Sequence, residues 1–147
     1  MRSSKRISKE LEKIIENPED GLIVNPIAPD HWQISFDGAN GTLYEGESFT
    51  VNVKFSPDYP IESPAVTFVI PAPVHPHIYS NGHICLNILG EDWSPALTVR
   101  SICLSLLSML SSATVKCYPH DNDRDVRTKG VGSNPKNTKF VYHDDSV

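Results

Sequence analysis

The sequence predicts one mixed domain in which an antiparallel β-meander lies between two helices. A helical hydrophobic period opens the chain, a strand period of two follows, and a second helical period begins near residue 98. The chain has 147 residues, and domains usually span roughly 100–200 residues. We therefore expect a single domain, 1–147, in which residues 117–147 form a loosely held C-terminal tail.

The first predicted helix lies in the segment RSSKRISKELEKIIEN. Apolar residues recur there at i, i+4, i+7 and i+8, which places them on one face; they are Ile7, Leu11, Ile14 and Ile15. Proline disfavours helix in the residue before it, so Asn17-Pro18 ends the helix. The outer face carries four basic residues, which form either a solvated surface or a contact for a partner: Lys5, Arg6, Lys9 and Lys13.

Alternation of polar and apolar residues predicts the meander, with one buried face. The alternation is clearest over 31–36 and 48–55, and short apolar runs at 21–24 and 65–70 indicate one strand before and one after. Prolines stiffen the loop PDYPIESP that precedes the last strand. Residues 71–95 show no regular period, and a long irregular segment inside a compact domain is usually functional or mobile.

A second helix is predicted over TVRSICLSLLSML. Cys103 belongs to its apolar stripe, so we expect this cysteine to pack as a small hydrophobic residue; the other members are Val99, Ile102, Leu106 and Leu110. After Ala113 the chain is polar and has no long apolar stripe, so we expect little regular structure there.

Composition and charge exclude several classes of protein. The net charge is −5, whereas a nucleic-acid-binding domain carries a dense basic surface. No apolar run approaches the roughly 20 residues of a membrane span, and the charged N-terminus lacks the apolar core of a signal peptide. The three cysteines, Cys85, Cys103 and Cys117, are odd in number and widely spaced, which favours reduced thiols. We expect a cytoplasmic and nuclear protein that binds neither nucleic acid nor membrane.

The segment VHPHIYSNGHICLNIL, residues 74–89, concentrates reactive side chains. A metal site has the donor types it needs in His75, His77, His83 and Cys85. Their order, H-x-H-x5-H-x-C, lacks a second cysteine pair or a helical HxxxH, so we expect no bound metal. A papain-like cysteine nucleophile is a second alternative, but the local signature of those proteases is absent.

Thioester chemistry fits the segment better than either alternative. Asn81-Gly82 gives a tight turn just before the cysteine, and alternation directs Ile84 and Leu86 into the core while Cys85 lies on an exposed ledge. A thiol with a pKa near 8.5 is already a few per cent thiolate at neutral pH, so it needs no strong base. The site also needs a donor for the oxyanion that forms when an amine attacks the thioester.

A set of motifs in this order and spacing resembles the ubiquitin-conjugating enzymes. The motifs are Tyr59-Pro60, the His75-Pro76 pair, NGHICL around Cys85, and Trp93-Ser94-Pro95 before the second helix. The resemblance runs from the first helix to about Ala113. It implies the α+β ubiquitin-conjugating (UBC) fold, with an N-terminal helix, a four-stranded antiparallel sheet, an active-site cysteine loop and a central helix, here followed by an atypical polar tail.

The resemblance also implies an activity and partners. Cys85 would accept ubiquitin from a ubiquitin-activating enzyme as a thioester and pass it to a substrate amine, without a cofactor, with a RING or U-box ligase bound. The activating enzyme would contact Lys5, Arg6 and Lys9. The ligase would contact two loops, through Pro60 and Ile61 in one and Trp93, Ser94, Pro95 and Ala96 in the other.

Two departures from the family pattern resemble its W-type branch, which modifies the α-amino group of flexible substrate N-termini. His77 stands where most members have asparagine, and the tail lacks the segment that directs lysine. His75 and Asn81 would support the active-site loop, and we expect His83 to pack in the loop or lie on the surface. Asp121 and Asn122 are the tail residues expected near Cys85, with Asp123 and Asp125 as alternatives.

Two other functions stay open at this point. One is ordinary lysine-directed conjugation, and the other is a non-catalytic module that recruits a ligase. The presence of Cys85 disfavours the second.

Overall fold

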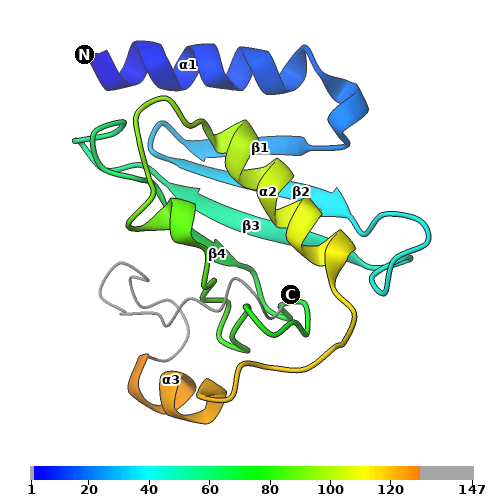
Figure 1. Ribbon diagram of the computed structural model, residues 1–147. Coiled ribbons are helices and arrows are strands. Elements are labelled where there is room, and N and C mark those ends of the chain that lie inside the picture. The colour runs from blue at the N-terminus through cyan, green and yellow to red at the C-terminus, as the bar shows by residue number, and fades with distance from the viewer. Residues whose placement is uncertain (1, 130–147) are drawn as a thin grey trace.

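The structure, a computed structural model, describes residues 2–129; Met1 and residues 130–147 lie outside the described part. Its elements are α1 (Arg2–Ile15), a 3-10 turn at Pro18–Asp20, β1 (Ile23–Ala28), β2 (His31–Asp37), β3 (Ser48–Lys54), β4 (Ala65–Phe68), a 3-10 turn at Asn87–Leu89, α2 (Val99–Ser112) and α3 (Asn122–Lys129). The strands form one antiparallel sheet in the order β1-β2-β3-β4, crossed by α2 (Figure 1). The predicted α+β fold is confirmed.

The sheet buries one face, as the alternation in the sequence predicts. Every second residue of β2 and β3 is buried, and the pairing places Trp32 opposite Val53 and Ile34 opposite Val51. These side chains form one core cluster with the buried stripe of α2. Each fully buried side chain of this kind contributes about 1.5–3 kcal/mol, so the sheet–α2 interface is the main source of stability.

A capping box opens α2. The Thr98 hydroxyl accepts from the Ser101 N–H at 3.1 Å, and the Ser101 hydroxyl accepts from the Thr98 N–H at 2.8 Å, so two amides of the first turn are satisfied. The predicted apolar stripe is buried, including Cys103. Burial raises the pKa of the Cys103 thiol to about 12, as expected for a cysteine that packs in the core.

The apolar stripe of α1 is narrower than predicted. Ile14 is buried, and Ile7 and Leu11 pack against the core. The prediction is wrong for Ile15, whose side chain is 67% exposed. Successive residues turn by about 100° around a helix axis, so the face centred on Ile14 leaves Ile15 towards solvent.

The segment after α2 contains a helix that the sequence did not predict. The expectation of little regular structure is wrong for α3. Its residues NDRDVRTK carry no apolar stripe, so hydrophobic periodicity could not predict the helix. Hydrogen bonds to the active-site segment hold it instead. The rest of the expected tail, 130–147, lies outside the described residues. Within residues 2–129, no helix is long and apolar enough to span a membrane.

Candidate active site

The active-site segment, residues 74–89, folds back on itself in a tight turn. The Gly82 N–H donates to the Tyr79 carbonyl at 2.9 Å, and the Tyr79 N–H donates to the His83 carbonyl at 2.9 Å. Gly82 has φ +94°, and a Cβ there would lie 2.3 Å from the Phe68 carbonyl oxygen, so both conformation and space require glycine. The predicted turn at Asn81-Gly82 is confirmed.

His75 fastens this segment to α2. Its Nε2 lies 3.2 Å from the Met109 carbonyl oxygen, and its Nδ1 accepts the His77 N–H at 2.9 Å. Burial is the main cause that lowers the pKa of His75 to about 4; the bond to the Met109 carbonyl opposes this shift, and the nearby His77 adds to it. His75 is therefore neutral at pH 7, with Nε2–H as the donor, and it orients the backbone of His77.

Cys85 lines a pocket of about 380 Å³. Its N–H donates to the His77 carbonyl at 2.8 Å, which sets the cysteine beside the His75-Pro76-His77 turn. The expectation of an exposed ledge is wrong, because Cys85 is only 5% exposed. The segment that follows α2 lines the same pocket as Cys85. One wall of the pocket comes from Pro76, His77 and Tyr79, and the other from Val115, Cys117, Tyr118, Pro119, His120, Asp121 and Arg124.

Asp121 is held in this pocket by a residue that the sequence analysis missed. The Tyr79 hydroxyl donates to both carboxylate oxygens of Asp121, at 2.9 and 3.1 Å. Burial and this bond raise the pKa of Tyr79, so the phenol stays a donor at neutral pH. Arg124 lies 3.5 Å from the same carboxylate. Residues 76–77 and 80–81 form turns, so strand alternation gave no signal that could have placed Tyr79 at the site.

Asn122, Asn81 and Asp125 join α3 to the turn. The Asn122 Oδ1 accepts the Ser80 N–H at 2.8 Å, and Asn81 Nδ2 donates to Asp125 at 2.7 Å. Asp125 and Asn81 are buried. His83, expected in the loop or on the surface, is fully buried against them. Within the described residues, no group of three or more histidine, cysteine or acidic side chains is arranged to hold a metal.

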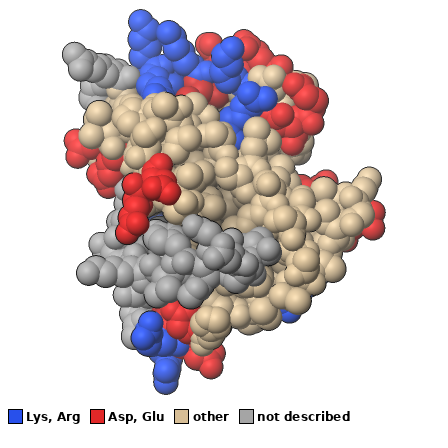
Figure 2. Space-filling model, in the orientation of Figure 1, with Lys and Arg blue, Asp and Glu red and all other residues tan. Residues whose placement is uncertain are grey.

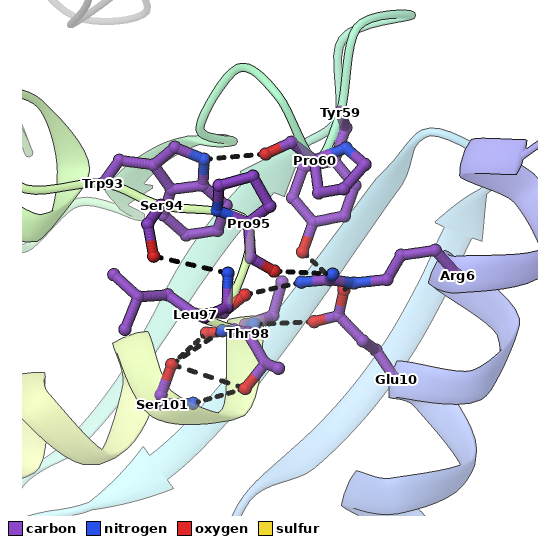
Figure 3. A network of polar contacts seen from close by, with 12 residues as sticks. Arg6, Glu10, Tyr59, Pro60, Trp93, Ser94, Pro95, Leu97, Thr98 and Ser101 are labelled. Atoms are coloured by element: carbon purple, nitrogen blue, oxygen red, sulfur yellow. Dashed lines mark hydrogen bonds and ion pairs between the residues drawn. The ribbon is translucent and has the colours of Figure 1, made fainter.

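A second polar network lies on the α1 side of the molecule (Figure 3). Arg6 donates to the carbonyls of Pro95 and Leu97 at 2.7 and 2.6 Å and to Glu10 at 2.8 Å. The expectation that Arg6 lies with the lysines on the outer face of α1 is therefore wrong, since its side chain is partly buried and its donors bind the loop before α2. Lys5 and Lys9 remain exposed. Figure 2 shows basic side chains gathered at the α1 end of the molecule.

The two loops expected to meet a ligase lie against each other. The Trp93 indole N–H donates to the Pro60 carbonyl at 2.9 Å, and its ring lies 5.9 Å from that of Tyr59. Ile61 projects from the first loop with 77% of its surface exposed. In the second loop Ser94, Pro95 and Ala96 are exposed. The network thus presents both loops as one preorganised surface.

Comparisons with known proteins agree with this geometry. The family model described as "Ubiquitin-conjugating enzyme" matches residues 6–136. The chain is 52% identical to "Probable ubiquitin-conjugating enzyme E2 W-A" of Danio rerio, covering 97% of this chain and 96% of that protein. It is 48% identical to "Ubiquitin-conjugating enzyme E2 W" of Caenorhabditis elegans, covering 99% and 97%.

A solved structure shows the same fold. The crystal structure of ubiquitin-conjugating enzyme E2 UbcA1 from Agrocybe aegerita superposes with a TM-score of 0.85 at 44% identity, covering 91% of this chain and 98% of that one. Members of this family are acyl transferases that work through a cysteine thioester and interact with ubiquitin, an activating enzyme and ligases. The chain belongs to the ubiquitin-conjugating enzyme family and, within it, to the W-type branch.

Proposed function

We propose that Cys85 carries ubiquitin as a thioester and transfers it to the α-amino group of a flexible substrate N-terminus, with a RING or U-box ligase bound. The observation that carries the proposal is one pocket lined by Cys85, His77 and Asp121. The pocket unites a nucleophile, a donor for an oxyanion and a carboxylate that can attract an ammonium group.

The two chemical steps need little from the protein beyond position. In loading, the Cys85 thiolate attacks the thioester of the activating enzyme; a new sulfur–carbonyl bond forms and the enzyme's thiolate leaves. In transfer, the neutral amine attacks the carbonyl carbon. The oxyanion collapses to an amide, Cys85 leaves as thiolate, and the amine loses a proton. An imidazole N–H of His77 can stabilise the oxyanion, since such donors act strongly in a site shielded from water.

The acceptor follows from the protonation of amines. An α-amine has a pKa of about 7.7–8.0 and a lysine of about 10.4, so at neutral pH the neutral fraction of the α-amine is about a few hundred times larger. An N-terminal amine therefore needs less help from the enzyme to lose its proton than a lysine does. A site with His77 in place of the usual asparagine can use such an amine without a group that deprotonates lysine. The similarity to W-type enzymes supports the same assignment.

Loading is tested with ubiquitin, ATP and activating enzyme on gels with and without reductant. Wild type should give a band that reductant removes, Cys85→Ser at most a reductant-resistant ester, and Cys85→Ala no band. Cys117→Ala, which changes the exposed thiol at the same pocket, is the matched control and should load. A reductant-sensitive band in Cys85→Ala would refute the assignment.

The acceptor is tested with one peptide in two forms, with a free and with an acetylated N-terminus, both containing lysine. The free peptide should be modified, with a rate that rises from pH 6.5 to about 8 and then levels off. The acetylated peptide should be inert.

Lysine-directed conjugation is the second candidate, because Asp121 is held at the pocket by Tyr79. A carboxylate there could also bind and deprotonate a lysine ammonium. Equal modification of the free and acetylated peptides, with a rate that keeps rising beyond about pH 9, would favour this candidate.

A further inference from the structure

Helix α3 cannot hold its own position. It has eight residues, NDRDVRTK, whereas isolated helices shorter than about 12–15 residues are marginal in water. Val126 is its one apolar residue. Hydrophobic burial therefore cannot dock this helix, and specific polar contacts have to do so.

Asp125 supplies the most buried of these contacts. Its carboxylate is 6% exposed and accepts from Asn81 Nδ2 at 2.7 Å. His83 Nδ1 lies 3.5 Å from the same oxygen, and the Asn81 Oδ1 accepts the His83 N–H at 3.1 Å. A buried carboxylate is strongly unfavourable unless it is hydrogen-bonded. Asp125 keeps its bond to Asn81 only when α3 packs on the turn in one register, so this contact selects that register.

We propose that Asp125 is a positioning residue that sets the acceptor side of the Cys85 pocket by locking α3 onto the active-site turn. The proposal rests on the proposed function in that the pocket receives the substrate amine. Asp125 lies one helical turn after Asp121, and its N–H donates to the Asp121 carbonyl at 3.0 Å. Asp121 and Arg124 line the pocket, so an error in the register of α3 displaces both.

The same helix offers a matched control. Asp123 has the same charge and lies in the same first turn, but it is exposed. Substituting either aspartate by alanine changes net charge and helix-end electrostatics alike. A difference between the two variants therefore reports the contact with the turn.

The first experiment compares Asp125→Ala with Asp123→Ala after loading. Asp125→Ala should load within about 2-fold of wild type but need a roughly 10-fold higher concentration of acceptor peptide for half-maximal discharge. Discharge by hydroxylamine, a small amine that needs no acceptor site, should be unchanged or faster. Backbone amides of 120–127 should exchange hydrogen faster. Asp123→Ala should match wild type in all four measurements.

Two outcomes would overturn the proposal. Faster transfer to the peptide in Asp125→Ala would mean that α3 obstructs the site, and equal behaviour of the two variants would mean that the contact with the turn has no effect.

The second experiment exchanges the partners. Asn81→Asp places two carboxylates together and should impair peptide discharge at least as much as Asp125→Ala. Adding Asp125→Asn to it restores an amide donor facing a carboxylate, with the direction reversed, and should recover peptide discharge to within about 3-fold of wild type. Absence of recovery, with loading intact, would overturn the proposal. Each variant is measured with free lysine as well as with peptide. A preference of wild type for lysine would refute the proposed α-amine acceptor. The comparison between Asp125→Ala and wild type would still test the role of Asp125 with either acceptor.

Discussion

Two buried carboxylates anchor helices at opposite ends of the molecule, Glu10 in α1 and Asp125 in α3 (Figure 1). Glu10 accepts from the Arg6 guanidinium, the Tyr59 hydroxyl and the Val99 N–H at the start of α2. Asp125 accepts from the neutral amide of Asn81 and lies near His83. One carboxylate therefore faces a permanent cation and the positive end of a long helix, and the other faces an amide and an imidazole.

The surroundings differ as much as the partners. The helix that carries Glu10 also buries Ile14 in the main core, so its anchor is coupled to global stability. The helix that carries Asp125 has no apolar stripe, so we expect α3 to detach from the turn without unfolding of the main core. Regions with few buried apolar contacts open at lower free energy than the core. The α1 end presents the two exposed loops, and the more easily opened α3 end lies at the Cys85 pocket.

The largest expected effect tests the coupling of the α1 anchor to stability. Glu10→Ala should lower the free energy of unfolding by about 3–5 kcal/mol, because it leaves a partly buried guanidinium, a buried phenol and a buried backbone amide without their common acceptor. Urea unfolding followed by Trp fluorescence measures this loss. Glu12→Ala, at an exposed position of the same helix, should change stability by less than about 0.5 kcal/mol. Similar values for the two variants would remove the distinction between the anchors.

Acid should open the active-site end before the α1 end. His75 has a pKa of about 4 in the fold, lowered chiefly by burial, and about 6.5 when unfolded. The unfolded chain therefore binds the proton first, so the contribution of His75 is complete above pH 6.5 and is lost as pH falls from 6.5 towards 4. Between pH 7 and pH 5 the loss is about 2 kcal/mol.

The pH effect is measured as the difference between wild type and His75→Gln in urea unfolding at both pH values. The variant should lack this part of the pH dependence, and His31→Gln on the outer face of the sheet should retain it. Hydrogen exchange at pH 5 should speed up around residues 75–85 more than in α1. The same slope in wild type and His75→Gln would exclude His75 as its source.

A smaller effect concerns the loop that Arg6 holds. Arg6→Lys keeps the charge but cannot serve both the Pro95 and Leu97 carbonyls, because lysine lacks the planar fork of donors. Stability should fall by about 1 kcal/mol, the net value of a hydrogen bond, and amides of 94–98 should exchange faster. Lys9→Arg, an exposed change of the same kind on α1, should leave both unchanged. Unaltered exchange in Arg6→Lys would show that the loop does not depend on Arg6.

The smallest expected effect on stability accompanies a change in function. Ile61→Ala should alter the free energy of unfolding by less than about 0.5 kcal/mol because the side chain is exposed, while ligase-stimulated discharge should fall several-fold and loading should be retained. Ile27→Ala, an exposed apolar change on β1, is the control and should leave discharge unchanged. Equal loss of loading and discharge in Ile61→Ala would indicate damage to the fold.

Local periodicity was enough to predict the part of the core that β2, β3 and α2 supply. Period-two alternation set the buried faces of β2 and β3, the apolar stripe set α2 and the packing of Cys103, and Asn81-Gly82 set the turn before Cys85. Each of these follows from the identities of residues close together in the chain, because side-chain direction in a strand or helix depends on spacing alone. The motifs around Cys85 and Trp93 could also be recognised from the sequence, since each is a short contiguous segment.

Tertiary structure alone decided the environment of the site. The pocket that Cys85 lines includes a segment more than 25 residues away along the chain. Arg6 is partly buried because the carbonyls of a loop some 90 residues later accept its donors. Helix α3 carries no hydrophobic period, so its existence depends on partners in the turn at 79–83. A polar residue has the same identity whether it is solvated or buried, and only the groups that the fold brings to it determine which.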